Sequence, residues 1–191
     1  YFQYDEELTQ KILKIRDKIL NPDDLNKYQV EIKDLEREIT LFHFKAVSKS
    51  LELSKSDVDL IGFHGQTIFH APEKKITKQM GDGLLLSQLT KKKVIYNFRQ
   101  NDLENGGQGA PLAPIFHNAL ANELNKKFNL GFPINILNIG GISNVTSTIE
   151  YNNLGLEEKI YACDIGPGNC LIDEWMKKNS KKKYDKEGLV A

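Results

Sequence analysis

Apolar residues recur at helical spacing over the first quarter of the chain. Residues 5–20 predict an amphipathic helix with one apolar face made of Leu8, Ile12, Ile15 and Ile19. Acids come early in this segment and lysines later, which suits the helix dipole. Residues 28–53 predict a longer helix whose buried stripe comprises Tyr28, Ile32, Leu35, Ile39, Phe42, Ala46 and Val47. Charged residues fill the opposite face of the longer helix, so we expect that face to lie in water.

Short apolar runs alternate with helical patterns from residue 58 onward. Strands are expected at 58–63, 94–98, 134–139, 142–149 and 159–164, and a hairpin is expected to join 67–69 to 75–78. Helices are expected over 84–89, 111–128 and 170–178, the second with an apolar face made of Leu112, Ile115, Phe116, Ala119, Leu120 and Leu124. This alternation of strands and helices places the chain in the α/β class.

The composition excludes several classes of function. Hydrophobic residues make up 40% of the chain and charged residues 27%, which is ordinary for a globular protein. The formal net charge is +0, so no overall field attracts nucleic acid or an anionic membrane. No apolar run is long enough to span a bilayer, and no secretory segment opens the chain. Two cysteines are too few for a disulfide framework or a zinc site. We therefore expect a cytoplasmic protein without nucleic-acid or membrane partners.

Polar side chains and glycines gather where four of the predicted strands end. Glycine turns after strands are common, so each cluster alone carries little information. Together they predict a site for a small polar ligand, because ligands bind at the carboxyl ends of strands in open α/β sheets. The four clusters span residues 64–67, 99–109, 138–144 and 164–169.

The second cluster is the most informative of the four. Arg99 and Asp102 precede a run of glycines, which lets backbone approach a ligand closely: Gly106, Gly107 and Gly109. The guanidinium fork of Arg99 suits a carboxylate or phosphate, although a structural ion pair is an alternative. Beside this loop Asp102 is a candidate general base, and a surface or helix-capping acid is the alternative.

The other clusters allow two interpretations each. One interpretation of the first cluster is that His64 or Gln66 forms a hydrogen bond to a substrate, and the other is that His64 is a packed histidine. The spacing of His64 and His70 fits no common metal site. Backbone N–H groups and small donors around Gly140–Gly141 and Ser143–Asn144 suit phosphate oxygens. Asp164 either holds Mg²⁺ through water or accepts a proton, or it stabilises the tight turn that follows.

These blocks resemble the motifs of one known family, the anhydro-N-acetylmuramic acid kinases. The matching segments read I-G-F-H-G-Q-T, N-F-R-Q-N-D with G-G-Q-G-A-P-L-A-P-I-F-H, N-I-G-G-I-S-N-V-T, and D-I-G-P-G-N-C-L-I-D. They follow the order of that family and cover residues 58–173 densely. The G-G-Q-G-A-P-L and D-x-G-P-G-N segments are not generic turn sequences, so the resemblance is specific.

The resemblance implies a fold and a division into domains. It implies an α/β, actin-like or hexokinase-like (ribonuclease H-like) fold of two lobes, here incomplete at both ends. Residues 1–109 would form the sugar-binding side of the first lobe, with a helical insert at 5–54 and an α/β part at 58–109. Residues 110–130 would form an interlobe helix. Residues 131–191 would begin the second, nucleotide-side lobe.

The resemblance also implies an activity. Family members open the 1,6-anhydro bond of anhydro-N-acetylmuramic acid with water and transfer the γ-phosphoryl group of ATP to O6, with Mg²⁺. The product, N-acetylmuramic acid 6-phosphate, enters peptidoglycan recycling. The partners would be the anhydro-sugar and ATP, and a homodimer is consistent with the family. The alternative is a truncated, non-catalytic remnant that binds sugar or a partner protein without turnover.

The site residues follow from the matching motifs. Asp102 would be the catalytic base, with Asp164 as the other candidate. The sugar would be bound by His64, Gln66, Thr67, Arg99, Gly106 and Gly107. The nucleotide phosphates would be bound by Gly140, Gly141, Ser143, Asn144, Asp164, Gly166, Gly168 and Asn169, and Asp164 would also face the metal.

Three departures from the family pattern bear on these expectations. Family members are longer, and they begin with a G-T-S-x-D-G hairpin that this chain lacks. The chain has no initiator Met and stops without a closing element, so we expect a piece of a longer protein that is incomplete for catalysis alone. Ile165 stands where the family usually has Thr in D-T-G-P-G-N, which removes a hydroxyl group near phosphate.

Overall fold

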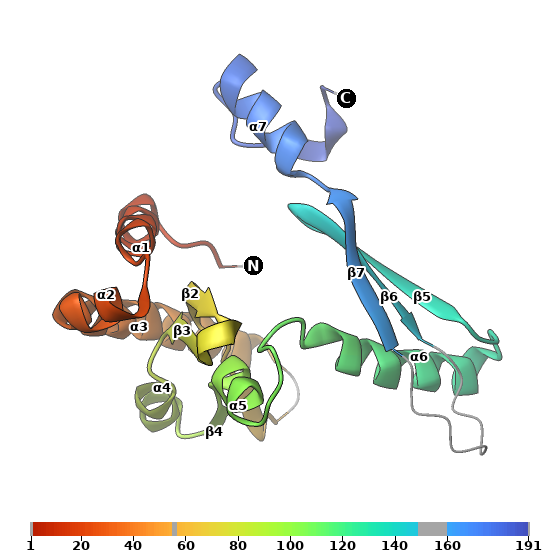
Figure 1. Cartoon of the computed structure of the whole chain (residues 1–191), viewed down its shortest axis with the longest axis horizontal. Coiled ribbons are helices and arrows are strands. Elements are labelled where there is room, and N and C mark those ends of the chain that lie inside the picture. Colours follow the sequence, from red (N-terminus) through yellow and green to blue (C-terminus); the bar gives the residue numbers. More distant parts are fainter. Residues whose placement is uncertain (1, 55–56, 149–159, 191) are drawn as a thin grey trace. The chain divides into compact units, whose positions relative to one another are not determined.

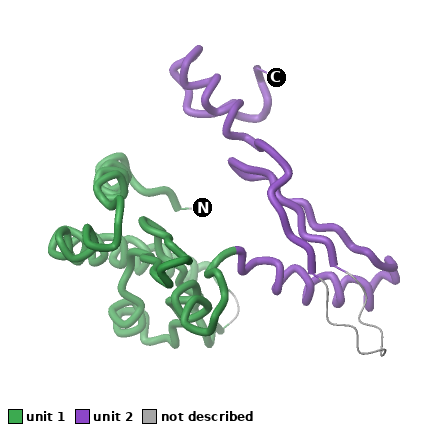
Figure 2. Tube along the Cα trace, viewed as in Figure 1, with its two compact units in different colours: residues 1–110 green, residues 111–191 purple. Residues whose placement is uncertain are grey.

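The computed structural model describes residues 2–54, 57–148 and 160–190 (Figure 1). It is a mixed α/β structure with helices and small sheets, consistent with the expected actin-like, hexokinase-like class. The chain divides into two compact units, residues 1–110 and 111–191 (Figure 2). Among the residues described, no helix combines the length and the apolarity needed to cross a membrane.

Helices dominate the first part of unit 1. Helix α1 (Glu6–Lys18) is capped by Asp5, α2 (Pro22–Lys27) begins with a capping box between Asn21 and Asp24, and α3 (Gln29–Leu53) follows. The predicted helices over 5–20 and 28–53 are thereby confirmed. The predicted apolar faces meet in one core that includes Leu8, Ile12, Ile15, Ile19, Ile32, Leu35 and Ile39.

Thr40 links α3 to the next helix. Its side chain is fully buried, and its hydroxyl donates to the carbonyl oxygen of Glu36 at 2.7 Å. The same oxygen accepts a hydrogen bond from the backbone N–H of Asp82 at 2.8 Å. Asp82 is the N-cap of α4 (Gly83–Thr90), so one buried hydroxyl fixes where α4 begins against α3.

Two small sheets complete unit 1. Strands β1 (Leu60–Gly62) and β4 (Lys93–Ile95) pair in parallel. Strands β2 (Gln66–Ala71) and β3 (Ile76–Met80) form an antiparallel hairpin around a 3₁₀ turn at Pro72–Lys74. The predicted hairpin is confirmed, and the strand expected at 58–63 is shorter than predicted.

The strand expected at 94–98 is wrong at its carboxyl end. Strand β4 ends at Ile95, and helix α5 begins at Phe98 and runs to Glu104. Between them Asn97 adopts a left-handed conformation with φ of 59°, which Asn tolerates better than most residues. This backbone conformation is incompatible with a strand, so the strand ends before it. Arg99 and Asp102 therefore lie on a helix and not in a loop.

Unit 2 is a three-stranded antiparallel sheet with two helices. Helix α6 (Ala113–Phe128) precedes β5 (Ile134–Ile139), β6 (Ile142–Thr148) and β7 (Ile160–Pro167), and helix α7 (Cys170–Asn179) and a 3₁₀ turn at Lys186–Gly188 follow. The sheet order is β5-β6-β7, so both predicted glycine-rich strand exits belong to one sheet. The predicted ends at residues 149 and 159 lie outside the described residues.

The predicted apolar face of α6 is wrong. Ile115 is 68% exposed and Phe116 66% exposed. The buried positions of α6 are Pro114, Asn118 and Ala121, on a face that packs against β6 and β7. His117 joins this contact through a 2.8 Å hydrogen bond between Nδ1 and the hydroxyl of Thr146. The small and polar side chains allow the helix to approach a sheet face that carries threonines, so burial does not follow the apolar stripe.

Candidate functional site

Helix α5 carries the two charged residues of the central motif. Arg99 and Asp102 are three positions apart, so they lie on neighbouring positions of one helix face. Leu103, beside them, is fully buried and anchors the helix in unit 1. Both charged side chains are only partly exposed.

Arg99 makes two hydrogen bonds at once. Its Nε donates to Nε2 of His64 at 2.8 Å, and one terminal nitrogen donates to the carbonyl oxygen of Gly109 at 2.8 Å. Arginine has no acceptor, so Nε2 of His64 accepts, and the ring proton sits on Nδ1. Nδ1 then donates to the carbonyl oxygen of Gly65 at 2.8 Å. In this arrangement His64 is neutral and its tautomer is fixed by its two partners.

Asp102 is held by the loop that follows α5. Its Oδ2 accepts from the backbone N–H of Gly109 at 2.7 Å, and its backbone carbonyl accepts from the N–H of Gly107 at 2.8 Å. Within the part of the chain that the structure describes, Oδ1 makes no hydrogen bond. One carboxylate oxygen is thus fixed and the other is available to a ligand or to water.

The three glycines of this loop are needed for different reasons. A Cβ on Gly107 would overlap the carboxylate of Asp102. Gly106 has open space around it but a φ of +91°, which L side chains rarely adopt. Gly109 has a φ of +71° and is packed so closely that a Cβ would meet His70 and Leu103 at 3.1 Å. Gly109 holds both charged side chains; the sequence placed it in the glycine run but gave it no role in binding.

The remaining predicted sugar residues lie on the neighbouring hairpin. Gln66 is exposed and pairs with Met80, and the hydroxyl of Thr67 accepts from the side chain of Gln79 at 3.3 Å. Neither Gln66 nor Thr67 is hydrogen bonded to Arg99 or Asp102 among the described residues. The structure thus joins His64, Arg99, Asp102 and the glycine loop, and it leaves Gln66 and Thr67 on β2.

Gln100 connects that hairpin to α5, and sequence reasoning missed it. Its Oε1 accepts from the backbone N–H of Thr77, and its Nε2 donates to the carbonyl oxygen of Lys75, both at 3.3 Å. The hydroxyl of Thr77 also lies 3.1 Å from Nδ1 of His70. Nothing in the sequence distinguishes Gln100 from a surface glutamine, because its role depends on which backbone groups the fold brings beside it.

In unit 2, the turn at Gly140–Gly141 binds the start of α7. The carbonyl oxygen of Gly140 accepts from the N–H of Asn169 at 2.7 Å, and that of Gly141 accepts from the N–H of Gly168 at 2.9 Å. A Cβ on Gly168 would overlap the carbonyl oxygen of Gly140. The backbone N–H groups of Gly168 and Asn169 are therefore already bonded within the protein, as is that of Gly140, which bonds to Ile142 at 3.3 Å.

Side chains of the same region form a polar row. Asn138 pairs directly with Asn144 on β6, and Asn144 pairs directly with Asp164 on β7. Directly paired residues of antiparallel strands point to the same face, so two amides and one carboxylate lie side by side. Ser143, one residue away, is nearly buried and lies against Gly168. Beyond this row Gly166 has a φ of +145° with open space around it.

The donor set of this row limits how a metal could bind. No group of three or more His, Cys, Asp or Glu side chains suited to a metal occurs among the described residues. Mg²⁺ commonly uses one or two carboxylates together with water and phosphate oxygens. Asp164, which is exposed, can supply one carboxylate ligand to such a site from the described part of the chain.

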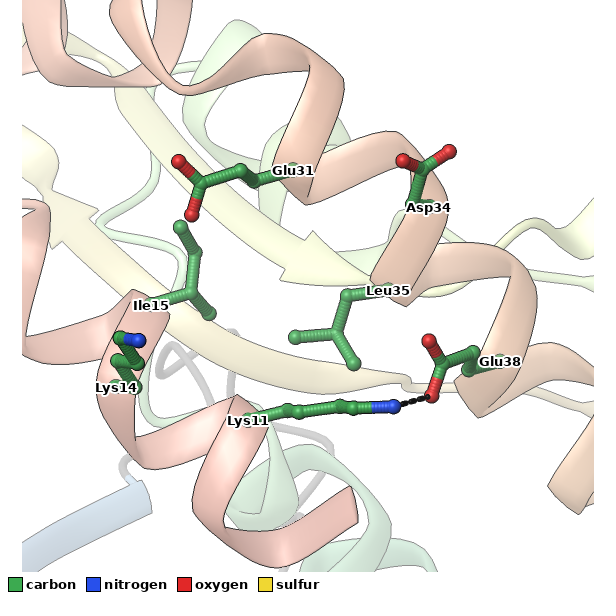
Figure 3. Close-up of a pocket in the computed structure, with 7 residues that line it drawn as sticks. All are labelled: Lys11, Lys14, Ile15, Glu31, Asp34, Leu35 and Glu38. Atoms are coloured by element: carbon green, nitrogen blue, oxygen red, sulfur yellow. Dashed lines mark hydrogen bonds and ion pairs between the residues drawn. The ribbon is translucent and has the colours of Figure 1, made fainter. Parts of the chain in front are cut away.

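A separate pocket of about 280 Å³ lies between α1 and α3 (Figure 3). Lys11, which lines it, bonds through Nζ to Oε2 of Glu38 at 2.9 Å, and this contact, with a smaller contribution from Glu7, raises the pKa of Lys11. The other lining residues are Lys14, Ile15, Glu31, Asp34 and Leu35. None of them is a predicted site residue, and charges of both signs line the pocket, so it is not the candidate site.

The comparisons with known proteins agree with the motifs. A family model described as anhydro-N-acetylmuramic acid kinase matches residues 1–191. A protein of that name from Pelagibacter ubique (strain HTCC1062) is 52% identical over 191 residues, which is 100% of this chain and 49% of the relative. One from Agrobacterium fabrum (strain C58 / ATCC 33970) is 41% identical over 201 residues, covering 100% of this chain and 50% of the relative. The chain thus spans about half the length of the curated relatives it matches.

Proposed function

Because the chain belongs to the anhydro-N-acetylmuramic acid kinase family, we propose that it contributes the sugar-binding site and the beginning of the nucleotide-binding lobe of a phosphotransferase. The reaction is the opening of 1,6-anhydro-N-acetylmuramic acid by water with transfer of the γ-phosphoryl group of ATP to O6. The product is N-acetylmuramic acid 6-phosphate, in cytoplasmic peptidoglycan recycling. The observation that carries this proposal is the shared anchoring of Arg99 and Asp102 by Gly109.

Asp102 is the proposed base. A general base needs a fixed carboxylate with one oxygen free to take a proton. Oδ2 is fixed by the N–H of Gly109, and Oδ1 is available to a water molecule. In the reaction that water forms a bond to C1 of the sugar and gives a proton to Asp102. The bond between C1 and O6 breaks, and O6 forms a bond to the γ-phosphorus as ADP leaves.

Arg99 is the proposed contact to the sugar's acidic group. Its Nε and one N–H of a terminal nitrogen are bonded to His64 and Gly109, so the remaining N–H groups, both of the second terminal nitrogen among them, are the donors left for a ligand among the described residues. Anhydro-N-acetylmuramic acid carries a carboxylate on its lactyl group, and a preoriented guanidinium binds a carboxylate strongly. His64, Gln66, Thr67, Gly106 and Gly107 complete the proposed sugar-binding set.

Unit 2 supplies the proposed beginning of the nucleotide side. Residues 1–109 would hold the sugar, residues 110–130 would connect the lobes, and residues 131–191 would begin the phosphate-binding lobe. Because the backbone N–H groups of Gly140, Gly168 and Asn169 are bonded within the protein, the side chains of Ser143, Asn144 and Asp164 are the stronger candidates toward phosphate. Gly141 and Gly166 would allow close approach, and Asp164 would be a ligand of Mg²⁺ from the described part of the chain. Magnesium supplies charge neutralisation on the phosphate oxygens when bound.

Two measurements test this function. Calorimetric titration of the 191-residue chain with 1,6-anhydro-N-acetylmuramic acid tests the sugar site, and the proposal predicts binding that Arg99→Ala weakens. Turnover is measured with ATP and Mg²⁺ in ¹⁸O-labelled water, in a protein of the relatives' full length that contains this chain. Short reactions should yield sugar phosphate with one ¹⁸O atom at C1. A phosphorylated product without the label would contradict hydrolytic opening, and absence of sugar binding would contradict the assignment of the site.

A further inference from the structure

An aromatic cluster connects the helical segment of unit 1 to the strand that leads into the site. The hydroxyl of Tyr4 and Nε2 of His43 share a hydrogen bond of 2.8 Å. Phe42 packs edge-on against Tyr4 with ring centres 4.5 Å apart, and His43 packs edge-on against Phe63 with ring centres 5.1 Å apart. Burial lowers the pKa of His43 and raises the pKa of Tyr4, so both groups are neutral near neutral pH.

Phe63 is confined on several sides. It is 5% exposed, and its backbone N–H donates to the carbonyl oxygen of Ile95 at 2.8 Å, which continues the pairing of β1 with β4. Its ring lies directly over Gly81, where a Cβ would collide with it. The imidazole of His43 closes another side of the ring. A ring held in this way has little room to change its rotamer.

His64 is the next residue, and its orientation matters to the site. Its Nε2 is the acceptor for Arg99, and its Nδ1 bonds to the carbonyl oxygen of Gly65. Gly65 in turn has a φ of +69°, and a Cβ there would overlap the carbonyl oxygen of Met80. The backbone of His64 is therefore fixed by Phe63 before it and by Gly65 after it.

We propose that His43 is a positioning residue of this site: its ring contact with Phe63 fixes the backbone of His64, and thereby the hydrogen bond from Arg99 to Nε2 of His64. Tyr4 holds the imidazole of His43 in the required orientation. The importance of this coupling for sugar binding rests on the proposed function. The coupling itself does not, because the hydrogen bond between Arg99 and His64 exists without a ligand.

The test reads the tautomer of His64 directly. In ¹⁵N-labelled protein, long-range proton–nitrogen spectra distinguish a ring protonated on Nδ1 from one protonated on Nε2. Wild-type protein should show His64 protonated on Nδ1, and His43→Ala should shift it to a mixture of tautomers. His43→Phe keeps a ring against Phe63 and should restore the wild-type signature. For sugar binding, His43→Ala should raise the Kd about tenfold, because the hydrogen bond that orients Arg99 against His64 is weakened.

A matched control separates positioning from loss of stability. Leu35→Ala truncates a buried side chain on the same helix, in a core cluster that does not include Phe63, and it should lower stability while leaving the His64 signature unchanged. If His43→Ala fails to fold, Phe63→Leu replaces it and should shift the tautomer in the same way. An unchanged signature in folded His43→Ala or Phe63→Leu would overturn the proposal, as would an equal shift in Leu35→Ala. Failure of the wild-type protein to bind sugar would instead count against the proposed function.

Discussion

The backbone N–H of Gly109 donates to Oδ2 of Asp102 at 2.7 Å, and this single contact fixes the proposed base. The carbonyl oxygen of the same residue accepts from Arg99 at 2.8 Å. One glycine thus contacts both the carboxylate of Asp102 and the guanidinium of Arg99 beside the same loop. Among the described residues, the carboxylate keeps one oxygen without a hydrogen bond and the guanidinium keeps one such nitrogen, which is the arrangement that the proposed chemistry requires.

Gly107→Ala should damage the site more than Gly106→Ala. The added Cβ at Gly107 would overlap the Asp102 carboxylate and displace it, so we expect turnover to fall by at least about 100-fold. At Gly106 the space is open and the φ of +91° makes the cost one of backbone strain, about 1–2 kcal/mol of stability. Turnover in a protein of the relatives' full length, and thermal unfolding, check this for both variants. Equal loss of turnover in the two, at matched stability, would contradict the described role of Gly107.

Arg99→Lys should weaken sugar binding although it keeps the charge. A lysine cannot bond to Nε2 of His64, to the carbonyl of Gly109 and to a ligand with the geometry of a guanidinium. Loss of one charged hydrogen bond corresponds to about 1.5–3 kcal/mol, so the Kd measured by calorimetry should rise at least about tenfold. Arg16→Lys, which changes an exposed pair with Asp17, serves as the control and should leave the Kd unchanged.

Gly168→Ala should destabilise unit 2, whereas Gly140→Ala should be tolerated. A Cβ on Gly168 would overlap the carbonyl oxygen of Gly140 and force the start of α7 away from the turn at 140–141. Such overpacking costs about 1–3 kcal/mol. A Cβ on Gly140 would meet its nearest neighbour, the carbonyl oxygen of Ile142, at an ordinary 3.6 Å. Urea unfolding of the two variants measures the difference, and similar stabilities would show that this close approach does not hold α7.

His43 should make the stability of unit 1 depend on pH below neutrality. Burial lowers its pKa from 6.5, so the unfolded chain takes up a proton that the folded protein refuses. The stability that the neutral ring of His43 gives the folded protein is fully present above about pH 6.5. It is lost as the pH falls from the pKa of His43 in the unfolded chain toward its lower pKa in the folded protein. The free energy of unfolding changes through this group by less than about 1.4 kcal/mol per pH unit, and partial exposure of the ring reduces the change further.

The comparison with His43→Phe isolates that contribution. Urea unfolding at pH 7.5 and 5.5 should show a larger loss of stability in the wild-type protein than in the variant, which has no titrating ring at this position. An identical loss in both proteins would mean that His43 titrates alike in the folded and unfolded chains.

Periodicity predicted the helical part of unit 1 well because burial there follows apolar side chains. Ile12 and Leu35 are buried as the pattern predicted. Unit 2 shows where this logic fails: α6 buries Asn118 and Ala121 and leaves Phe116 exposed. The partner surface decides which face of a helix is buried, and a single helix pattern carries no information about the sheet it meets.

The motifs indicated a candidate site, but not the contacts within it. The run at 94–98 resembled one strand because four of its five residues are apolar, and Asn97, which ends the strand in a left-handed conformation, is a weak signal in sequence. The roles of Gly109 and Gln100 depend on backbone groups of other segments. The assignment of Asp102, Arg99 and the phosphate-side residues to steps of the reaction stays a prediction.

The most direct test of Asp102 as the general base is to measure the turnover and sugar affinity of Asp102→Asn in the full-length protein. The amide oxygen of the new side chain can still accept from the N–H of Gly109, so the loop should keep its shape. We predict a Kd for the anhydro-sugar within about threefold of wild type and a loss of turnover of at least about 100-fold, because the general base is gone. Near-normal turnover would contradict the account and would move the role of base to Asp164.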